Sequence, residues 1–504
     1  MSFNFAPITS AIASFRKWIS RTPSAPIQKL PPELLVEIFS IHWSPFDEDD
    51  SEAGLPEEDP SLSFREELEH LAHAPLLDLS TVCSQWHSII LGTPSLWRKI
   101  RLVGSIWSDE PEDVAKVMQL LNAALARSNR YPLTLVLSGT EAKQSYATAV
   151  QLLASSSERW KSLTIRYDGI MVAALSSIEG HLPRLESLFI EFGEGEFEQS
   201  ALDVFSSTPA LQILYFYGLA DGFSKFPLRQ LTSLTCLTIS SVQIPDIVAL
   251  TPSLRDGASL TLEMFMMDDE VVWELDLEII PATSSIGELR IDVDTDQPFA
   301  GSIFKDVLGS MFSSLTLPLL ETMQLNIPRS TQLYQGSFPW PSQHFLALSQ
   351  RSSFSSHLLS LFLIDLIVTE AELVECLHGL QALESLSIGD HDKAYSGTDH
   401  HLITDSLLTR LTRTNDSDSA VLIPRLRFFT CRSSLEFSDS KYYECICSRA
   451  SSDDVPEGCF ESDLVCLYDP PREQEAVTSR VDELCAAGRL KLQVISQDTW
   501  LSPA

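Results

Sequence analysis

The chain has 504 residues, of which 44% are hydrophobic and 21% charged, so it is long enough for about two to four globular domains. Its formal net charge of −34 disfavours nucleic acid as a general partner, because an acidic surface repels a phosphate backbone, whereas a basic protein partner or plain solubility is compatible with it. The longest apolar run, LLSLFLIDLIV, is interrupted by Asp365 and falls short of the roughly 18 residues that a membrane span needs, so we expect no membrane segment.

The N-terminal segment differs in composition from the rest. Its first 32 residues contain no acid and carry Arg16, Lys17, Arg21 and Lys29 among serines and small apolar residues. This is faintly typical of a mitochondrial leader, but terminal arms are usually disordered. We therefore interpret residues 1–26 as a flexible arm.

The first predicted helix lies in IQKLPPELLVEIFSIHW, residues 27–43. Paired prolines suit a helix start, and Glu33 in the first turn is favourable against the helix dipole. Apolar residues at three- and four-residue steps share one face: Leu34, Leu35, Ile38 and Phe39. The acidic run that follows, DEDDSEAGLPEEDP, cannot begin a core.

Residues 42–75 form a separate block, with this charge run first and then SLSFREELEHLAHAPLL, which has the pattern of a short helix. A second amphipathic helix is predicted in LLDLSTVCSQWHSIILGTPSLW, where Gly92 suits the C-terminal end and Pro94 the stop. Its apolar residues at helical spacing are Leu79, Val82, Cys83, Trp86, Ile89 and Ile90.

Beyond about residue 96, a six-residue pattern of apolar-x-x-apolar-x-apolar recurs. The copies begin at Trp160, Leu185, Leu211, Leu234, Ile286, Leu320, Leu358 and Leu383. The first four are about 25 residues apart, within the range of leucine-rich repeats, and later spacings are irregular. Because one repeat cannot bury its own leucines, this favours a degenerate α/β solenoid with a parallel, horseshoe-like sheet over a sandwich of unrelated strands.

The C-terminal stretch VDELCAAGRLKLQVIS has the pattern of a helix, a turn at Gly488 and a last strand, which we interpret as the terminal cap.

The nine cysteines are an odd number scattered along a chain without a secretory leader, which indicates reduced thiols and a place in the cytoplasm, the nucleus or both. Four of them crowd into YECICSRASSDDVPEGCFESDLVC, but the spacing does not match a zinc site. The histidines of HDKAYSGTDHH suggest a solvated loop. We expect no metal and no cofactor.

Catalytic motifs are missing from the sequence. It contains no Walker-type phosphate loop, no His-Glu-x-x-His and no Gly-x-Ser-x-Gly, and FGEGEFE lacks the third glycine of a nucleotide-binding turn. We expect a protein that is not an enzyme.

The two N-terminal helices together resemble the F-box. The matching positions are Leu30, Pro31, Glu33, Ile38, Phe39, Val82, Cys83, Trp86, Pro94 and Trp97. The whole chain is similar to fungal F-box proteins with degenerate leucine-rich repeats, in which TPSLWRKIRL matches the usual first strand and LLNAALARSNRYPLTLVL the next helix and strand. The domains are then an F-box at 27–98 with an acidic insertion at about 44–72, and repeats at 99–504.

This resemblance implies docking on a Skp-type adaptor, which links the chain to a cullin–RING ubiquitin ligase. The adaptor-binding residues are then Leu30, Pro31, Leu34, Leu35, Ile38, Val82 and Trp86. For Ile38, Phe39 and Trp86, packing between the helices is an equal alternative. The insertion of about 35 residues is thermodynamically inexpensive, and weakened docking, regulation or no effect all remain open.

The repeats would then bind the recruited target. Residues between the inward-facing apolar positions are expected on the concave face: Thr164, Arg166, Phe189, Glu191, Tyr215, Tyr217, Arg290, Asp292, Gln324, Asn326 and Phe362. Aromatic and Arg side chains dominate binding hot spots, which selects Arg166, Phe189, Tyr215, Tyr217 and Arg290, with ordinary surface residues as the alternative.

The leading hypothesis is therefore a non-catalytic substrate-recognition subunit of a ubiquitin ligase. The alternative is a leucine-rich-repeat scaffold whose F-box no longer docks to the adaptor.

Overall fold

The computed structural model describes residues 27, 30–42, 71, 73–104, 109–138, 144–167, 169–192, 199–217, 220–266, 279–295, 300–327, 338–364, 366–390, 401–413, 421–451, 459–467 and 475–496. The predicted N-terminal arm and, apart from Leu71, the predicted acidic insertion lie outside the described residues.

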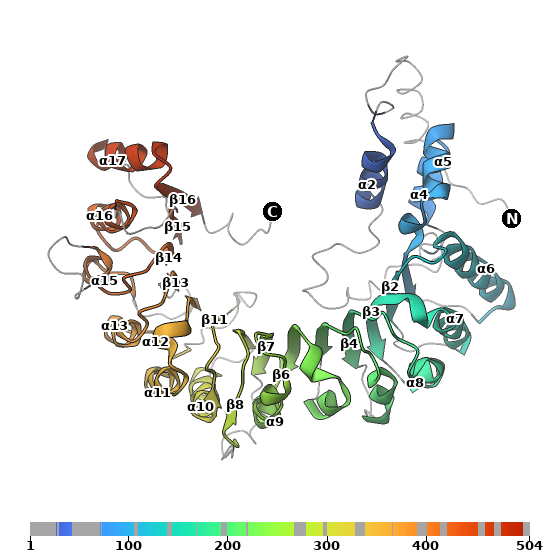
Figure 1. Cartoon of the computed structure of the whole chain (residues 1–504), viewed down its shortest axis with the longest axis horizontal. Helices are drawn as coiled ribbons and strands as arrows, with labels where there is room; N and C mark the ends of the chain where they lie inside the picture. Colours follow the sequence, from blue (N-terminus) through green and yellow to red (C-terminus); the bar gives the residue numbers. More distant parts are fainter. Residues whose placement is uncertain are drawn as a thin grey trace. The chain divides into compact units, whose positions relative to one another are not determined.

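The fold is mixed α/β, with N-terminal helices followed by one large parallel sheet whose 14 strands are neighbours in chain order (Figure 1). These strands are β1 (Lys99–Val103), β2 (Leu133–Ser138), β3 (Trp160–Tyr167), β4 (Ser187–Phe192), β5 (Ile213–Tyr217), β6 (Ser233–Ile239), β7 (Ser259–Met266), β9 (Glu288–Thr295), β11 (Thr322–Asn326), β12 (Ser360–Ile364), β13 (Ser385–Gly389), β14 (Phe428–Ser433), β15 (Phe460–Cys466) and β16 (Leu490–Ser496). A separate parallel pair joins β8 (Ala282–Thr283) to β10 (Leu315–Thr316).

Helices connect the strands, as parallel pairing requires. The α-helices are α2 (Pro32–His42), α4 (Ala74–Ser80), α5 (Ser84–Gly92), α6 (Pro111–Arg127), α7 (Gln144–Ala154), α8 (Gly169–Leu175), α9 (Ile244–Leu250), α10 (Ala300–Ser314), α11 (Ser342–Ser352), α12 (Phe354–His357), α13 (Glu370–His378), α15 (Asp405–Leu411), α16 (Asp439–Ala450) and α17 (Glu475–Ala486). Short 3-10 helices replace them elsewhere, namely η3 (Pro94–Trp97), η5 (Ser157–Arg159), η6 (Ser176–Ile178), η7 (Gln199–Phe205), η8 (Ala220–Lys225), η9 (Leu228–Gln230), η10 (Ser241–Gln243) and η11 (Thr251–Ser253).

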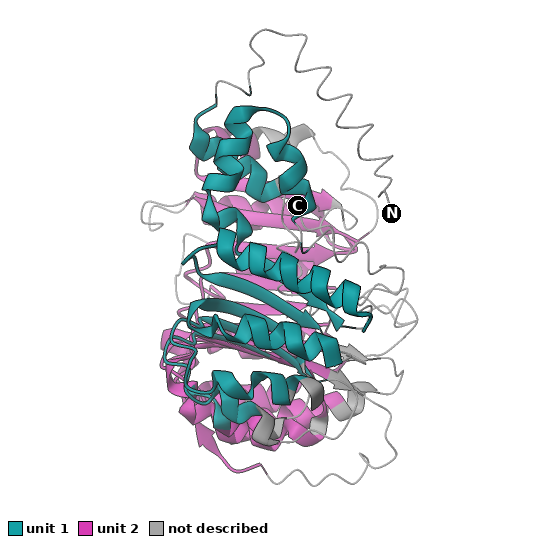
Figure 2. Cartoon of the chain, turned by 90° about the vertical axis from the view of Figure 1, so that its right-hand side faces the viewer, with its two compact units in different colours: residues 1–215, 225–227 teal, residues 216–224, 228–504 magenta. Residues whose placement is uncertain are grey.

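The chain divides into two compact units, shown in different colours in Figure 2. Unit 1 comprises residues 1–215 and 225–227, so it holds the N-terminal helices together with β1–β4, and unit 2 comprises the remainder. Within each unit the helices that connect the strands lie along one face of them (Figure 1). No helix in the described part of the chain combines the length and apolarity needed to cross a membrane.

The eight six-residue runs predicted as strands are confirmed, because each contains a strand of the large sheet. Their apolar positions are buried as expected; Leu163 and Ile165 of β3, for example, alternate with the half-buried Thr164. The pattern missed β7, where Gly257 occupies the first apolar position of the template, and β15, which lies in the stretch weighed as a metal site.

Backbone hydrogen bonds repeat where consecutive strands begin. In unit 1 the N–H of Glu186 donates to Lys161 O at 2.8 Å, and in unit 2 the N–H of Glu384 donates to Leu359 O at 2.8 Å. The N–H of Arg427 continues this ladder onto Glu384 O at 2.8 Å. Each strand thus takes its register from the one before it, because a shift of one residue would turn its leucines away from the core.

The second N-terminal helix was predicted as one continuous helix, and this is wrong. It is broken between Ser80 and Ser84 into α4 and α5. The hydroxyls of Ser80 and Thr81 donate to the carbonyls of Leu77 and Asp78 at 2.6 and 2.8 Å, and such local bonds compete with helix continuation. The predicted end at Gly92 is confirmed.

The predicted helix, turn and strand of the C-terminal stretch are confirmed. Helix α17 is followed by Gly488 at φ 68°, a left-handed conformation that favours glycine, and then by β16.

Candidate functional site

Helix α2 begins where its sequence predicts. Pro32 occupies the first helical position, the N–H of Leu35 donates to Pro31 O at 3.2 Å, and Glu33 lies in the first turn. Proline costs nothing at this position because its missing N–H would have no helical partner.

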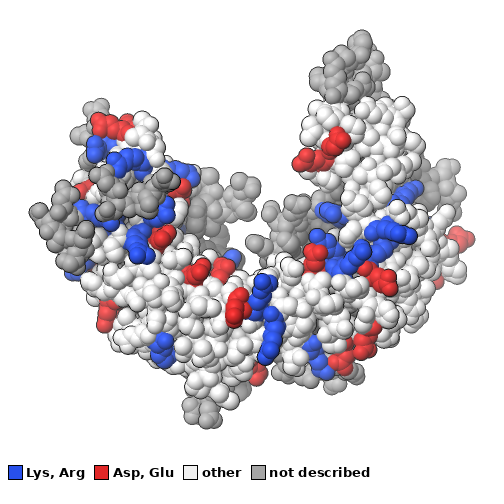
Figure 3. Space-filling view, in the orientation of Figure 1, with Lys and Arg blue, Asp and Glu red and all other residues white. Residues whose placement is uncertain are grey.

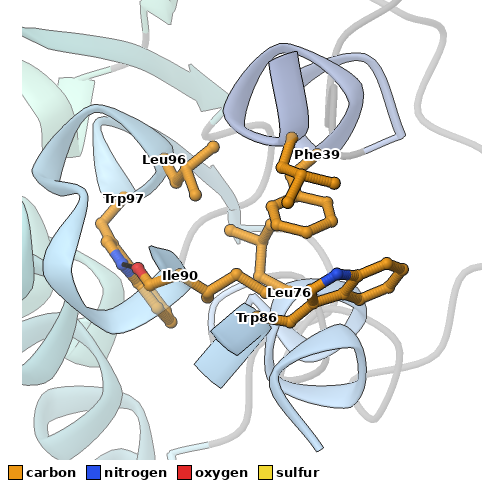
Figure 4. Packing of buried hydrophobic residues seen from close by; sticks show 7 residues of the cluster. Phe39, Leu76, Trp86, Ile90, Leu96 and Trp97 are labelled. Atoms are coloured by element: carbon orange, nitrogen blue, oxygen red, sulfur yellow. Dashed lines mark hydrogen bonds between the residues drawn. The ribbon is translucent and has the colours of Figure 1, made fainter. Parts of the chain in front are cut away.

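The N-terminal helices share a small core, shown in Figure 4. Its buried members are Leu35, Phe39, Leu76, Trp86, Ile90, Leu96 and Trp97. Phe39 of α2 meets the indole of Trp86 of α5 edge-on, with ring centres 4.9 Å apart. The alternative weighed for Phe39 and Trp86, packing between the helices, is therefore the one that their positions support.

Trp97, the last residue of η3, closes this core. Its indole Nε1 donates to Ile90 O at 2.9 Å, and its ring centre lies 5.1 Å from that of His73. The side chain is fully buried. By contrast, the indole N–H of Trp86 is buried without a hydrogen-bond partner in the described structure.

A second face of α2 is apolar and exposed. Leu34, Ile38 and Ile41 are 45%, 40% and 75% exposed, and their four- and three-residue spacing places them on one side of the helix. Leu91, near the end of α5, is also exposed. A contiguous apolar helix face of this kind is typical of a protein-binding surface.

The seven residues predicted to bind an adaptor occupy different environments. Pro31, Leu34 and Ile38 are exposed, and Leu30 and Val82 are half-buried against the core. The other two, Leu35 and Trp86, are buried inside the core, so they support the exposed face rather than form it. Sequence reasoning missed Ile41 and Leu91, although the step of seven from Leu34 was a signal for Ile41.

The residues predicted to bind a target divide between the units. Unit 1 holds Arg166, Phe189 and Tyr215. The guanidinium of Arg166 contacts Glu191 at 2.8 Å, and the ring of Phe189 stacks on that of Tyr215 with centres 6.1 Å apart. The expectation that Phe189 is exposed is wrong: the neighbouring side chains on the sheet leave it only 5% exposed.

Unit 2 holds the other two. Tyr217 is 37% exposed at the end of β5, whereas Arg290 of β9 pairs with Asp292 through a contact of 2.7 Å. Asp292, also predicted to be exposed, is largely buried beside this guanidinium. In each unit the predicted arginine thus has a carboxylate partner, Glu191 for Arg166 and Asp292 for Arg290.

A serine, a histidine and an aspartate do meet in unit 2. His401 Nδ1 lies 3.1 Å from Ser434 Oγ, which donates to Asp390 Oδ2 at 3.3 Å. In a nucleophilic triad the carboxylate orients the histidine, whereas here it holds the serine. The histidines His391 and His400 lie outside the described residues.

The cysteines are all free thiols. Cys445 and Cys447 lie on α16, Cys459 directly precedes β15, and Cys466 is the last residue of that strand. Burial raises the pKa of Cys445 to about 11, which keeps that thiol protonated and unreactive. In the described part of the chain, no group of three or more His, Cys, Asp or Glu residues is arranged to hold a metal ion.

Comparison with known proteins identifies the N-terminal region. Residues 27–103 match the F-box-like family model. No curated protein matches the chain. The matched residues span α2, α4, α5, η3 and β1, and the first four of these elements build the small core and its exposed apolar face. The chain therefore carries an F-box-like domain at residues 27–103.

Proposed function

We propose that this protein is a substrate-recognition subunit of a Skp–cullin–F-box type ubiquitin ligase. The F-box-like domain docks on a Skp-type adaptor and through it on a cullin scaffold, and the large parallel sheet with its helices recruits the target protein. The chain itself carries out no chemistry and works in the cytoplasm, the nucleus or both.

The observation that carries this proposal is that α2 has two apolar faces. Leu35 and Phe39 are buried in the internal core, whereas Leu34, Ile38 and Ile41 remain exposed on a neighbouring face. Burying an apolar residue of this size is worth about 1.5–3 kcal/mol, so three of them supply much of the driving force for docking a partner helix.

For the sheet domain we propose a degenerate leucine-rich-repeat solenoid. Its support is the agreement between the repeated apolar pattern and strands that are all parallel and neighbours in chain order. A solenoid presents a long polar sheet face, and such faces bind proteins in other repeat folds.

The mechanism is proximity. A target held on the sheet domain lies at high effective concentration relative to the ubiquitin-loaded enzyme that the cullin recruits, so that an acceptor lysine encounters it often.

The test is a pull-down with a purified Skp-type adaptor. The full chain should bind, and Leu34→Asp with Ile38→Asp should abolish binding, because both side chains are exposed and their replacement leaves the core intact. Val242→Asp is the matched control, since Val242 is an exposed apolar residue outside the F-box-like domain.

Deletion of the acidic run at 44–59 completes the test and keeps the buried Leu71. If neither the intact chain nor the deletion variant binds the adaptor, the ligase proposal fails and the scaffold alternative takes its place. If the Leu34 and Ile38 variant still binds, the docking face is not on α2.

A further inference from the structure

The starting edge of the unit 1 sheet carries a row of basic side chains. Because parallel strands begin at the same edge, the residues that lead into β1–β4 lie side by side. These residues include Arg98, Lys99, Arg130, Arg159, Lys161 and Arg184, which we call the basic edge. Figure 3 shows Lys and Arg side chains gathered over β2 and α6 in this part of unit 1.

Hydrogen bonds and an ion pair link neighbouring positions of the basic edge. Arg159 donates through Nη2 to Ser128 Oγ at 2.7 Å and to Tyr131 O at 3.0 Å, and so reaches the turn that carries Arg130. The ammonium of Lys161 lies 3.2 Å from Glu186 at the start of β4. These contacts link the start of β3 to the turn before β2 and to the start of β4.

The basic edge has few carboxylates of its own. Glu158 and Glu186 lie on it, and Glu186 already forms an ion pair with Lys161. Arg130 and Arg184 are exposed and make no ion pair in the described structure. In a chain with a net charge of −34, this local excess of positive charge is unexpected for a surface that only needs to be soluble.

We propose that the basic edge of unit 1 binds an extended peptide segment rich in Asp and Glu on a partner protein. Adjacent strands are about 4.8 Å apart, so the four strand starts span about 15 Å, which matches about five residues of an extended peptide. Exposed guanidinium groups such as those of Arg130 and Arg184 suit carboxylates, because each can form a forked pair of hydrogen bonds.

Screening by salt favours a short acidic peptide over a nucleic acid as the ligand of this edge. At physiological salt, charges interact over about 8 Å, so a short acidic peptide responds to the local positive charge of the edge. A long polyanion also meets the surrounding acidic surface and is repelled by it. The inference extends the proposed function by adding the class of the recruited target, and peptide binding itself requires no adaptor.

The experiment measures fluorescence anisotropy of labelled octapeptides with the full chain and without adaptor. The probes are an Asp/Glu peptide, its Asn/Gln counterpart, a phosphoserine peptide and a single-stranded oligonucleotide. The Asp/Glu peptide should bind, the neutral peptide should not, and the affinity should fall about tenfold between about 50 and 300 mM salt.

Arg130→Glu with Arg184→Glu should weaken binding of the Asp/Glu peptide by at least about tenfold, since charge reversal replaces attraction by repulsion. The matched control is Arg410→Glu with Arg480→Glu, which changes the net charge equally at exposed positions of unit 2 and should leave affinity within about twofold. Circular dichroism checks that both variants fold. If the edge variant does not fold, the salt dependence and the comparison of peptides on the unmodified chain test the proposal instead.

Several results would overturn the proposal. They are absence of binding by the Asp/Glu peptide at low salt, equal loss in both double variants, and tighter binding of the phosphoserine peptide or the oligonucleotide. Binding that emerges only after deletion of residues 44–59 would assign the edge to the chain's own acidic run. Failure of adaptor docking with intact peptide binding would refute the proposed function and leave this inference standing.

Discussion

The guanidinium carbon of Arg127 lies 4.4 Å from the centre of the Trp97 ring. Arg127 ends α6, the first helix beyond the F-box-like domain's last matched residue, and Trp97 closes the core of that domain. This contact therefore joins the F-box-like core to the first helix of the sheet domain within unit 1.

We expect Arg127→Ala to lower the free energy of unfolding of unit 1 by about 1 kcal/mol, because a cation over a buried indole contributes about that much. Urea unfolding followed by circular dichroism measures the change. Arg130→Ala, an exposed arginine three residues later, should change stability by less than about 0.5 kcal/mol, and equal effects of the two would mean that the ring contact contributes nothing.

Replacement by phenylalanine should lower the free energy of unfolding by different amounts at the two core tryptophans. Trp86→Phe removes an indole N–H that has no partner in the described structure, so we expect a loss below about 1.5 kcal/mol. Trp97→Phe also removes the bond to Ile90 O and leaves that carbonyl buried without its donor, which should cost about 1–3 kcal/mol more. Thermal unfolding of each variant tests the order, and a larger loss for Trp86→Phe would contradict it.

Asp390 is a fully buried carboxylate that connects the end of β13 to the end of β14. It accepts hydrogen bonds from the N–H groups of Leu402 and Ile403 at 2.8 and 2.9 Å, and from Ser434 N at 3.1 Å. Asp390→Ala leaves these donors without an acceptor and should destabilise unit 2 by about 3 kcal/mol, measured by urea unfolding. The control Asp256→Ala alters an exposed carboxylate, and its effect should stay within about 0.5 kcal/mol.

A capping box at the start of α13 makes the stability of unit 2 depend on pH. The N–H of Thr369 donates to Glu372 Oε2 at 3.0 Å, and its hydroxyl accepts from Glu372 N at 3.3 Å. Burial acts to raise the pKa of Glu372, but the hydrogen bonds from Thr369 and Ser342 and the charge of Lys305 together hold it below its usual value.

Because this pKa is lower in the folded than in the unfolded chain, the stabilisation is present above the unfolded value and is lost as the pH falls through the folded value. Glu372→Gln should therefore destabilise unit 2 by about 0.5 kcal/mol near pH 7 and by less near pH 3, because the carboxylate is progressively protonated as the pH falls. Urea titrations at both pH values measure this. The control is Glu375→Gln, an exposed position outside the box; a deficit for Glu372→Gln that persists in acid would rule out the charge as its cause.

Much of the architecture could be predicted from local pattern. The spacing of apolar residues located eight strands of the sheet, and the prolines before Glu33 located the start of α2. These predictions succeed because a repeat has to present its leucines to its neighbours in the same way each time, so the requirement is written in the sequence of each repeat.

The candidate site was less accessible to the same reasoning. Leu34 and Leu35 are adjacent and chemically identical, yet one is exposed and the other is buried. The break at Thr81 turns α5 so that Trp86 meets Phe39, and Ser80 and Thr81 give little sign of that break in the sequence. Which apolar residues remain for a partner depends on how the helices pack, and periodicity alone cannot distinguish the two faces.

By itself, then, the sequence determined eight strands of the sheet, the burial of their leucine positions and the likeness of the N-terminal region to an F-box. Only the tertiary structure decided that Phe189 is covered while Ile41 is exposed, and that Arg130, Arg159 and Arg184 share one edge. The reason is physical: a strand or helix is specified by neighbours a few residues away, whereas exposure and clustering depend on residues brought together from distant parts of the chain.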